Sequence, residues 1–240
     1  IIVLNTIGAN QLNQFKNDLD ARLQAGEDKK VAIVDILKQY YKDSKNILFE
    51  GNGYSEEWRI EAARRGLSNI SKTVDALACY VAPDSVDVFD KTGVLSPREV
   101  HARYEIELEN YVKHVQIESR VIEDLSLNHI MSTCVKYQFK LAQTARSLTE
   151  MGMLDEAKPI REIIADISRH VTVIKKLVYE MTECRKKANH APSLGERARL
   201  YGEEVKSYFE RIRYHVDKLE LLIDDEDWPL VKYRELLFIK

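Results

Sequence analysis

A long run without helix-breaking residues constrains this chain more than any other feature of its sequence. Residues 98–151 contain neither glycine nor proline. Just before the run, Ser96 and Glu99 form an S-x-x-E capping box, and Pro97 occupies the first helical position, where its missing N–H is harmless. We therefore expect one helix from Ser96 to Met151. At a rise of 1.5 Å per residue it would be roughly 80 Å long, so it needs helical partners along its length.

Two further helices can supply those partners. Gly152 marks the first break, and after a second break at 189–192 another capping box, Ser193 with Glu196, opens a helix that should end near Ile223. The first of these helices has a heptad-like apolar seam and the second an apolar stripe: Ile160, Ile163, Ile164, Ile167, Val171, Ile174, Val178 and Met181, then Val205, Phe209, Ile212, Val216, Leu219 and Leu222. Because the links are short, the helices must run up, down and up. The expected fold is all-α, with an antiparallel, coiled-coil-like bundle of long helices over residues 96–223.

The remaining residues are expected to form a collar of shorter N-terminal helices and a docking tail. Residues 1–26 read as one amphipathic helix, residues 27–95 as the collar with a glycine-rich turn, and residues 224–240 as the tail. In the collar we expect a helix near 30–44 and another that follows Ser55. The residues expected to start or end the shorter helices are Gly26, Ser55, Gly66, Asp84 or Ser85, and Gly93.

Charge and cysteine content exclude several classes of function. The 36 basic and 39 acidic residues give a formal net charge of −3, which disfavours binding to nucleic acid or to a membrane surface. The three cysteines, Cys79, Cys134 and Cys184, form no CxxC pair and favour a reducing, cytoplasmic location. The chain starts at Ile1 within an apolar helical pattern and without a methionine, so we expect it to be cut from a longer polypeptide.

The histidines and acidic residues of this chain give little support for a metal site. Di-iron and di-manganese bundles use Glu-x-x-His pairs, but no glutamate lies three residues before any histidine of this chain, and no HxxxH or HExxH pair occurs. The histidines are His101, His114, His129, His170, His190 and His215. Glu118, Glu123 and His129 lie near the inner stripe of the long helix. We expect an arginine, either Arg120 or one from another helix, to neutralise a buried carboxylate there.

Other candidate sites have simpler structural explanations. The Gly51-Asn52-Gly53 loop lacks the rest of a phosphate-binding motif and is expected to be a tight turn with glycines at positive φ. Cys134 lies in the middle of a helix, where a thiol packs like an apolar residue. Five aromatic residues are expected in the core and interfaces, and seven basic residues on a solvated face. These are Tyr104, Tyr111, Tyr137, Tyr208 and Phe209, and Arg185, Lys186, Lys187, Arg197, Arg199, Arg211 and Arg213.

Several strings resemble the carboxyl-terminal region of type III glutamine synthetases. They are LFEGNGYSEEW at Leu48–Trp58, ARRGL at Ala63–Leu67, ARYEIELE at Ala102–Glu109, IESR at Ile117–Arg120 and DWPLVKYRELLF at Asp227–Phe238. The opening VLNTIGANQLNQF is similar to the last helix of the family's catalytic domain. Together these strings extend the resemblance over nearly the whole chain.

The resemblance implies a parent enzyme that joins ammonia to glutamate through γ-glutamyl phosphate, using ATP and Mg²⁺ or Mn²⁺, with its subunits in two stacked rings. The family's metal-binding acids, phosphate-contacting arginines and ammonia-site groups belong upstream of Ile1 and match no stretch here. We therefore assign no catalytic, cofactor-binding or metal-binding residue. The expected partners are the upstream catalytic domain and other subunits of a ring-shaped homo-oligomer, and the chain alone is expected to be inactive.

Two alternative functions remain open from the sequence. A stand-alone helical adaptor that binds proteins would be encoded by a gene beginning shortly before Ile1, whereas a ligase requires several hundred upstream residues with acidic metal motifs. A metal-binding bundle enzyme would require iron, zinc or manganese bound to the isolated chain.

Overall fold

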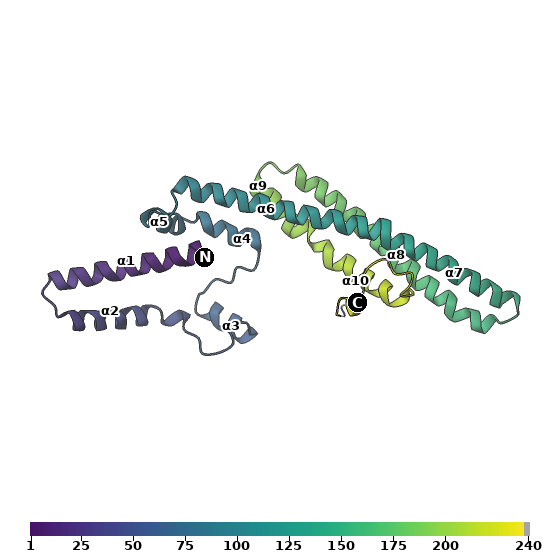
Figure 1. Ribbon diagram of the computed structural model, residues 1–240, viewed down its shortest axis with the longest axis horizontal. Coiled ribbons are helices and arrows are strands. Elements are labelled where there is room, and N and C mark those ends of the chain that lie inside the picture. Colours follow the sequence, from purple (N-terminus) through teal and green to yellow (C-terminus); the bar gives the residue numbers. More distant parts are fainter. Residues whose placement is uncertain (238–240) are drawn as a thin grey trace. The chain divides into compact units, whose positions relative to one another are not determined.

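In the computed structural model the described part of the chain, residues 1–237 without the side chains of 233 and 234, is helical and contains no strand (Figure 1). The predicted all-α class is therefore confirmed. The chain divides into two compact units, Ile1–Glu107 and Leu108–Lys240. None of the described helices is both long enough and apolar enough to cross a membrane.

The first unit consists of short helices whose ends follow local sequence signals. The two longest, α1 (Ile2–Gln24) and α2 (Lys29–Asp43), pair as a hairpin in which Tyr40 Oη donates a 2.6 Å hydrogen bond to Asp18. The shorter elements are η1 (Lys45–Ile47), α3 (Glu56–Arg64), α4 (Thr73–Ala78), η2 (Cys79–Val81) and α5 (Pro83–Lys91). Ser55 caps α3, and Gly26, Gly66 and Gly93 take positive φ after α1, α3 and α5, as predicted.

Two local predictions in this unit are wrong. Helix α5 begins at Pro83, before Asp84, because proline has the φ angle of the first helical position built in. In the loop before α3, neither Gly51 nor Gly53 has positive φ. Gly51 is required for space instead, since a Cβ there would lie 2.8 Å from the Phe49 ring, and Asn52 closes the turn by accepting a hydrogen bond from the Tyr54 N–H.

The predicted long helix runs from residue 97 to residue 150, but with a change of helix type near its middle. It consists of α6 (Pro97–Asp124), the π-helical segment η3 (Leu125–Ile130) and α7 (Met131–Glu150). Its start has the predicted capping box, because the Ser96 N–H donates to Glu99 at 2.8 Å and the Glu99 N–H to Ser96 Oγ at 3.4 Å. The π turn shifts the angular position of the residues that follow it.

The second unit brings α7 together with two later helical segments. A three-residue link that contains Gly152 at φ +83° reverses the chain into α8 (Leu154–Asn189), which lies beside α7 (Figure 1). A second short link leads to α9 (Leu194–Leu200), the π-helical η4 (Tyr201–Val205) and α10 (Ser207–Leu222), which packs against α8. The start and end of each predicted long helix thus agree with the structure to within two residues.

The core of this unit lies along the predicted seam. Six apolar side chains of α8 and α10 that the sequence placed on the two stripes are almost fully buried: Ile167, Ile174, Val178, Met181, Ile212 and Leu219. Burying each such side chain stabilises the fold by about 1.5–3 kcal/mol, so the seam supplies the main attraction between the helices.

Residues 224–232 lie against the bundle. Trp228 is buried, Asp227 accepts from Lys140 Nζ at 2.7 Å, and Lys232 pairs with Asp225. A four-residue helix, α11 (Tyr233–Leu236), follows. The docking tail predicted for residues 224–240 includes residues 238–240, which lie outside the described residues.

Candidate functional site

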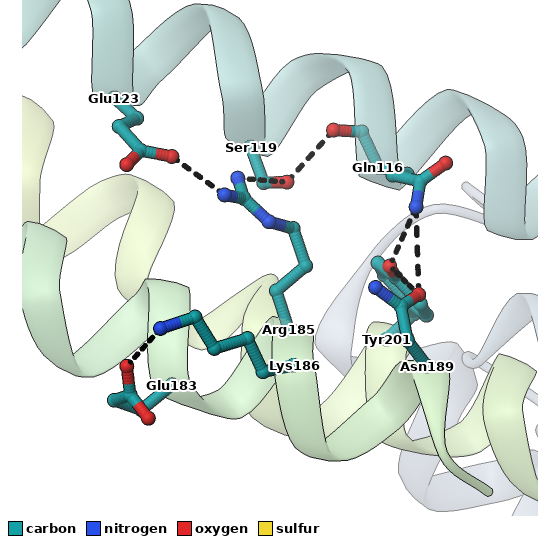
Figure 2. A network of polar contacts seen from close by, with 8 residues as sticks. All are labelled: Gln116, Ser119, Glu123, Glu183, Arg185, Lys186, Asn189 and Tyr201. Carbon is teal, nitrogen blue, oxygen red and sulfur yellow. Dashed lines mark hydrogen bonds and ion pairs between the residues drawn. The ribbon is translucent and has the colours of Figure 1, made fainter.

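A network of polar side chains joins α6, α8 and η4 inside the second unit (Figure 2). At one end, Arg185 of α8 donates from Nη2 to Glu123 Oε2 of α6 at 2.6 Å and from Nη1 to Ser119 Oγ at 3.4 Å. The Arg185 side chain is only 12% exposed and that of Glu123 is 29% exposed. A charge-assisted hydrogen bond in such a partly dry position is stronger than a pair on the surface.

At the other end of the network three neutral polar groups share their hydrogen bonds. Tyr201 Oη donates to Asn189 Oδ1 at 2.7 Å, and Gln116 Nε2 donates to Tyr201 Oη at 3.2 Å and to Asn189 Oδ1 at 3.4 Å. Tyr201 is fully buried, so its hydroxyl needs such partners. The two ends meet at Ser119, whose hydroxyl donates to the backbone carbonyl of Gln116 at 2.8 Å.

Helical spacing explains why these side chains meet. Gln116, Ser119 and Glu123 are separated by three and four residues on α6, and Arg185 and Asn189 by four on α8, so each set lies on one face of its helix. Each helix therefore presents a row of polar groups to the other. A shift of one helix along the other would separate several donors from their acceptors, so the network fixes the relative position of the helices.

The network confirms one sequence prediction and overturns another. The carboxylate of Glu123 is neutralised by an arginine from another helix, as predicted. The prediction that Arg185 lies on a solvated basic face is wrong, because its side chain turns toward α6. Its neighbours Lys186 and Lys187 are exposed and pair with Glu183 at 2.7 Å and Glu204 at 3.1 Å. Figure 2 shows the Lys186–Glu183 pair directed away from α6.

Gln116, Ser119, Asn189 and Tyr201 were not singled out from the sequence. A signal for the first two exists, since they precede Glu123 at helical spacing on the side that carries Val112 and Val115, both buried. No local signal distinguishes Asn189, because it lies at the end of its helix, where an asparagine is ordinary.

The other candidate residues lie apart from this network. Glu118 is exposed, and His129 is exposed with Nε2 3.8 Å from Asp124. Cys134 is buried, as expected of a packing thiol, and burial raises its pKa to about 12. The five predicted core or interface aromatics are all half-buried, and the Arg211 guanidinium lies 5.0 Å from the centre of the Tyr208 ring.

Two of the candidate sites considered in the sequence can be compared with the described residues. No group of three or more His, Cys, Asp or Glu side chains in the described part of the chain is arranged to hold a metal ion. The Gly51-Asn52-Gly53 loop is a turn held by its own asparagine. The contacts of the network itself are one ion pair and several neutral hydrogen bonds between helices.

An apolar groove of about 400 Å³ lies beside the network, between α6–η3 and α10. Its apolar lining includes Leu125, Phe209 and Val216, and its polar lining residues are Glu118, Ser126, Glu210 and Arg213. Elsewhere on the part of α6 and α7 that lies in the second unit, Ile117, Val135 and Phe139 are 59–64% exposed. Exposed apolar side chains mark a surface that contacts another protein where they form a contiguous patch.

Comparison with known proteins gives a consistent result. Residues 32–149 match the family model of the glutamine synthetase C-terminal domain. The whole chain is 46% identical to a glutamine synthetase of Bacteroides fragilis and 27% identical to the type-3 glutamine synthetase of Dictyostelium discoideum, and 95% of it aligns at 29% identity with a glutamine synthetase of Butyrivibrio fibrisolvens. The chain spans about a third of the length of these relatives, 33–34%.

Proposed function

Because this chain belongs with the C-terminal region of the glutamine synthetases, as its resemblance to the type III enzymes indicated, we propose that it is the helical architectural part of such a ligase. The proposed reaction of the complete enzyme joins ammonia to glutamate. ATP transfers its terminal phosphoryl group to the γ-carboxylate, which releases ADP, and ammonia then displaces phosphate to give glutamine. ATP and Mg²⁺ or Mn²⁺ belong, in this proposal, to the upstream catalytic domain, and the enzyme acts in the cytoplasm.

The observation that carries the architectural role is the interhelical network around Arg185 and Glu123. It uses charged and polar side chains to join α6, α8 and η4. The exposed apolar residues of α6 and α7 support a role in assembly, because an apolar surface of this kind is normally covered by another subunit or domain. The proposed partners are the upstream catalytic domain and other copies in a ring.

The proposal is tested by measuring glutamine formation with two proteins. The product of the complete reading frame that encodes this chain should form glutamine from glutamate, ammonia, ATP and Mg²⁺, whereas the purified 240-residue chain should form none under the same conditions. Glutamine formed by the chain alone would refute the assignment of all chemistry to the upstream part. An inactive complete product without upstream acidic motifs would favour the stand-alone helical adaptor instead.

A further inference from the structure

Two histidines that are distant in the sequence lie in contact where α8 packs on α10. His170 Nδ1 and His215 Nδ1 are 2.8 Å apart, and the ring centres are 5.1 Å apart. Both side chains are half-buried at the edge of the core seam, since His170 lies between Ile167 and Ile174 and His215 between Ile212 and Leu219. At this distance one Nδ1 must donate a hydrogen bond and the other must accept it.

This hydrogen bond depends on the number of protons that the two rings carry. With both rings neutral, a proton on one Nδ1 meets the lone pair of the other. A first proton makes one ring a cation, and the other ring, with its own proton on Nε2, still accepts at Nδ1, so the hydrogen bond is kept. When a second proton is bound, both Nδ1 atoms are donors, the hydrogen bond is lost, and two positive charges face each other. We propose that His170 and His215 form an acid-sensitive latch that joins α8 to α10 near neutral pH and weakens when both rings are charged.

The surroundings of the pair favour its neutral state. Burial lowers the pKa of His170 and of His215, and a charge on His170 lowers the pKa of His215 further. From α8, Arg169 opposes a charge on His170 while Asp166 favours it, and these two pair with each other at 3.0 Å. From α10, Lys218 opposes the charge, and Glu210, Arg211 and Tyr214 line the same groove as His215.

The direction of the pH effect follows from these lowered values. Because the unfolded chain takes up the two protons more readily than the folded chain, the contribution of the pair is present above the ordinary histidine pKa and is lost as the pH falls. For unit charges at the 5.1 Å separation of the ring centres, Coulomb's law in water gives about a fourfold change in the unfolding equilibrium constant, and more where the pair is dry. The latch does not depend on the proposed ligase function.

A double-mutant cycle on the full chain isolates this effect from all other titrating groups. Urea unfolding of wild type, His170→Gln, His215→Gln and the double variant gives the coupling between the two positions at pH 8 and at pH 5. We expect favourable coupling at pH 8 that becomes unfavourable at pH 5, with a change of about fourfold or more in the equilibrium constant. His114→Gln, at an exposed position on α6, is the control and should show no coupling to His215 at either pH.

A measurement on the unmodified chain removes any dependence on how well the variants fold. The imidazole signals of His170 and His215, followed by NMR from pH 8 to pH 4, should titrate in two steps, with the second proton bound only at a pH below the ordinary histidine range. Coupling that is the same at pH 5 and pH 8, or two histidines that titrate independently at their ordinary pKa, would overturn the proposal.

Discussion

Removal of the Glu123 carboxylate should destabilise the second unit far more than removal of an exposed acid. In Glu123→Leu the Arg185 guanidinium loses its 2.6 Å partner and keeps only the 3.4 Å contact with Ser119, while its side chain remains 88% covered (12% exposed). A charge left without its partner in a covered position is the costly outcome, because water cannot replace the lost carboxylate.

The loss of folding stability in each variant follows from how exposed the Glu123 and Arg185 side chains are. Breaking a fully buried ion pair by removing one partner costs about 3–5 kcal/mol. Glu123 is 29% exposed, so the pair is already partly solvated and about 2–3 kcal/mol is expected for Glu123→Leu. Arg185→Met should cost less, about 1–2 kcal/mol, because the carboxylate left behind is the more exposed partner. The double variant should unfold within about 1 kcal/mol of wild type, since no charge is left unpaired.

Urea unfolding followed by tryptophan fluorescence measures these differences. The chain has two tryptophans, Trp58 in the first unit and Trp228 in the second, so a Trp58→Phe background reports on the second unit alone. The matched control is Glu150→Gln, which breaks an exposed pair with Arg146 on α7 and should cost less than about 0.5 kcal/mol. A Glu123→Leu variant no less stable than this control, or a double variant as unstable as the two single changes combined, would refute the reasoning.

Three further outcomes are expected from single groups. Two arginine side chains that hydrogen-bond to Glu61 lower its pKa to about 2, so its NMR titration should have a midpoint near 2, and its contribution to stability should be lost as the pH falls from the ordinary 4.5. Cys134, buried and with its pKa raised to about 12, should react with iodoacetamide only after unfolding, whereas exposed Cys79 should react in the native chain. Gly202→Ala should lose the gain of about 1 kcal/mol that alanine normally brings to a helix, because its Cβ would lie 2.7 Å from Tyr111 Oη. In a Tyr111→Phe background, which lacks this hydroxyl, Gly202→Ala should show the gain again, and urea unfolding measures it in both backgrounds.

The helices could be predicted from the sequence because their ends depend on local chemistry. The capping box of Ser96 and Glu99 starts the long helix, and Gly152 ends it. Each acts on the residues next to it, and the structure has the capping box and a positive φ at Gly152. The π turn at Leu125–Ile130 could not be predicted, since neither a glycine nor a proline marks it in the sequence.

The candidate site was predictable only in part. The need of Glu123 for an arginine from another helix follows from its place on the inner stripe. The sequence does not identify Arg185 as this arginine. Arg185 is followed by two lysines that are exposed, and only the angular position of Arg185 on α8 directs its side chain to α6. The contact of His170 with His215 likewise requires the register of two helices, although each histidine lies three residues after a stripe isoleucine, which places it at the edge of the seam.

The most direct test of the architectural role is the mass of the assembled protein. Mass photometry would compare the product of the complete reading frame with the same product lacking residues 97–222, after circular dichroism has verified that the remainder is folded. The account predicts a large oligomer for the complete product and a monomer or small assembly for the shortened one. A shortened protein that forms oligomers of the original subunit number would contradict it.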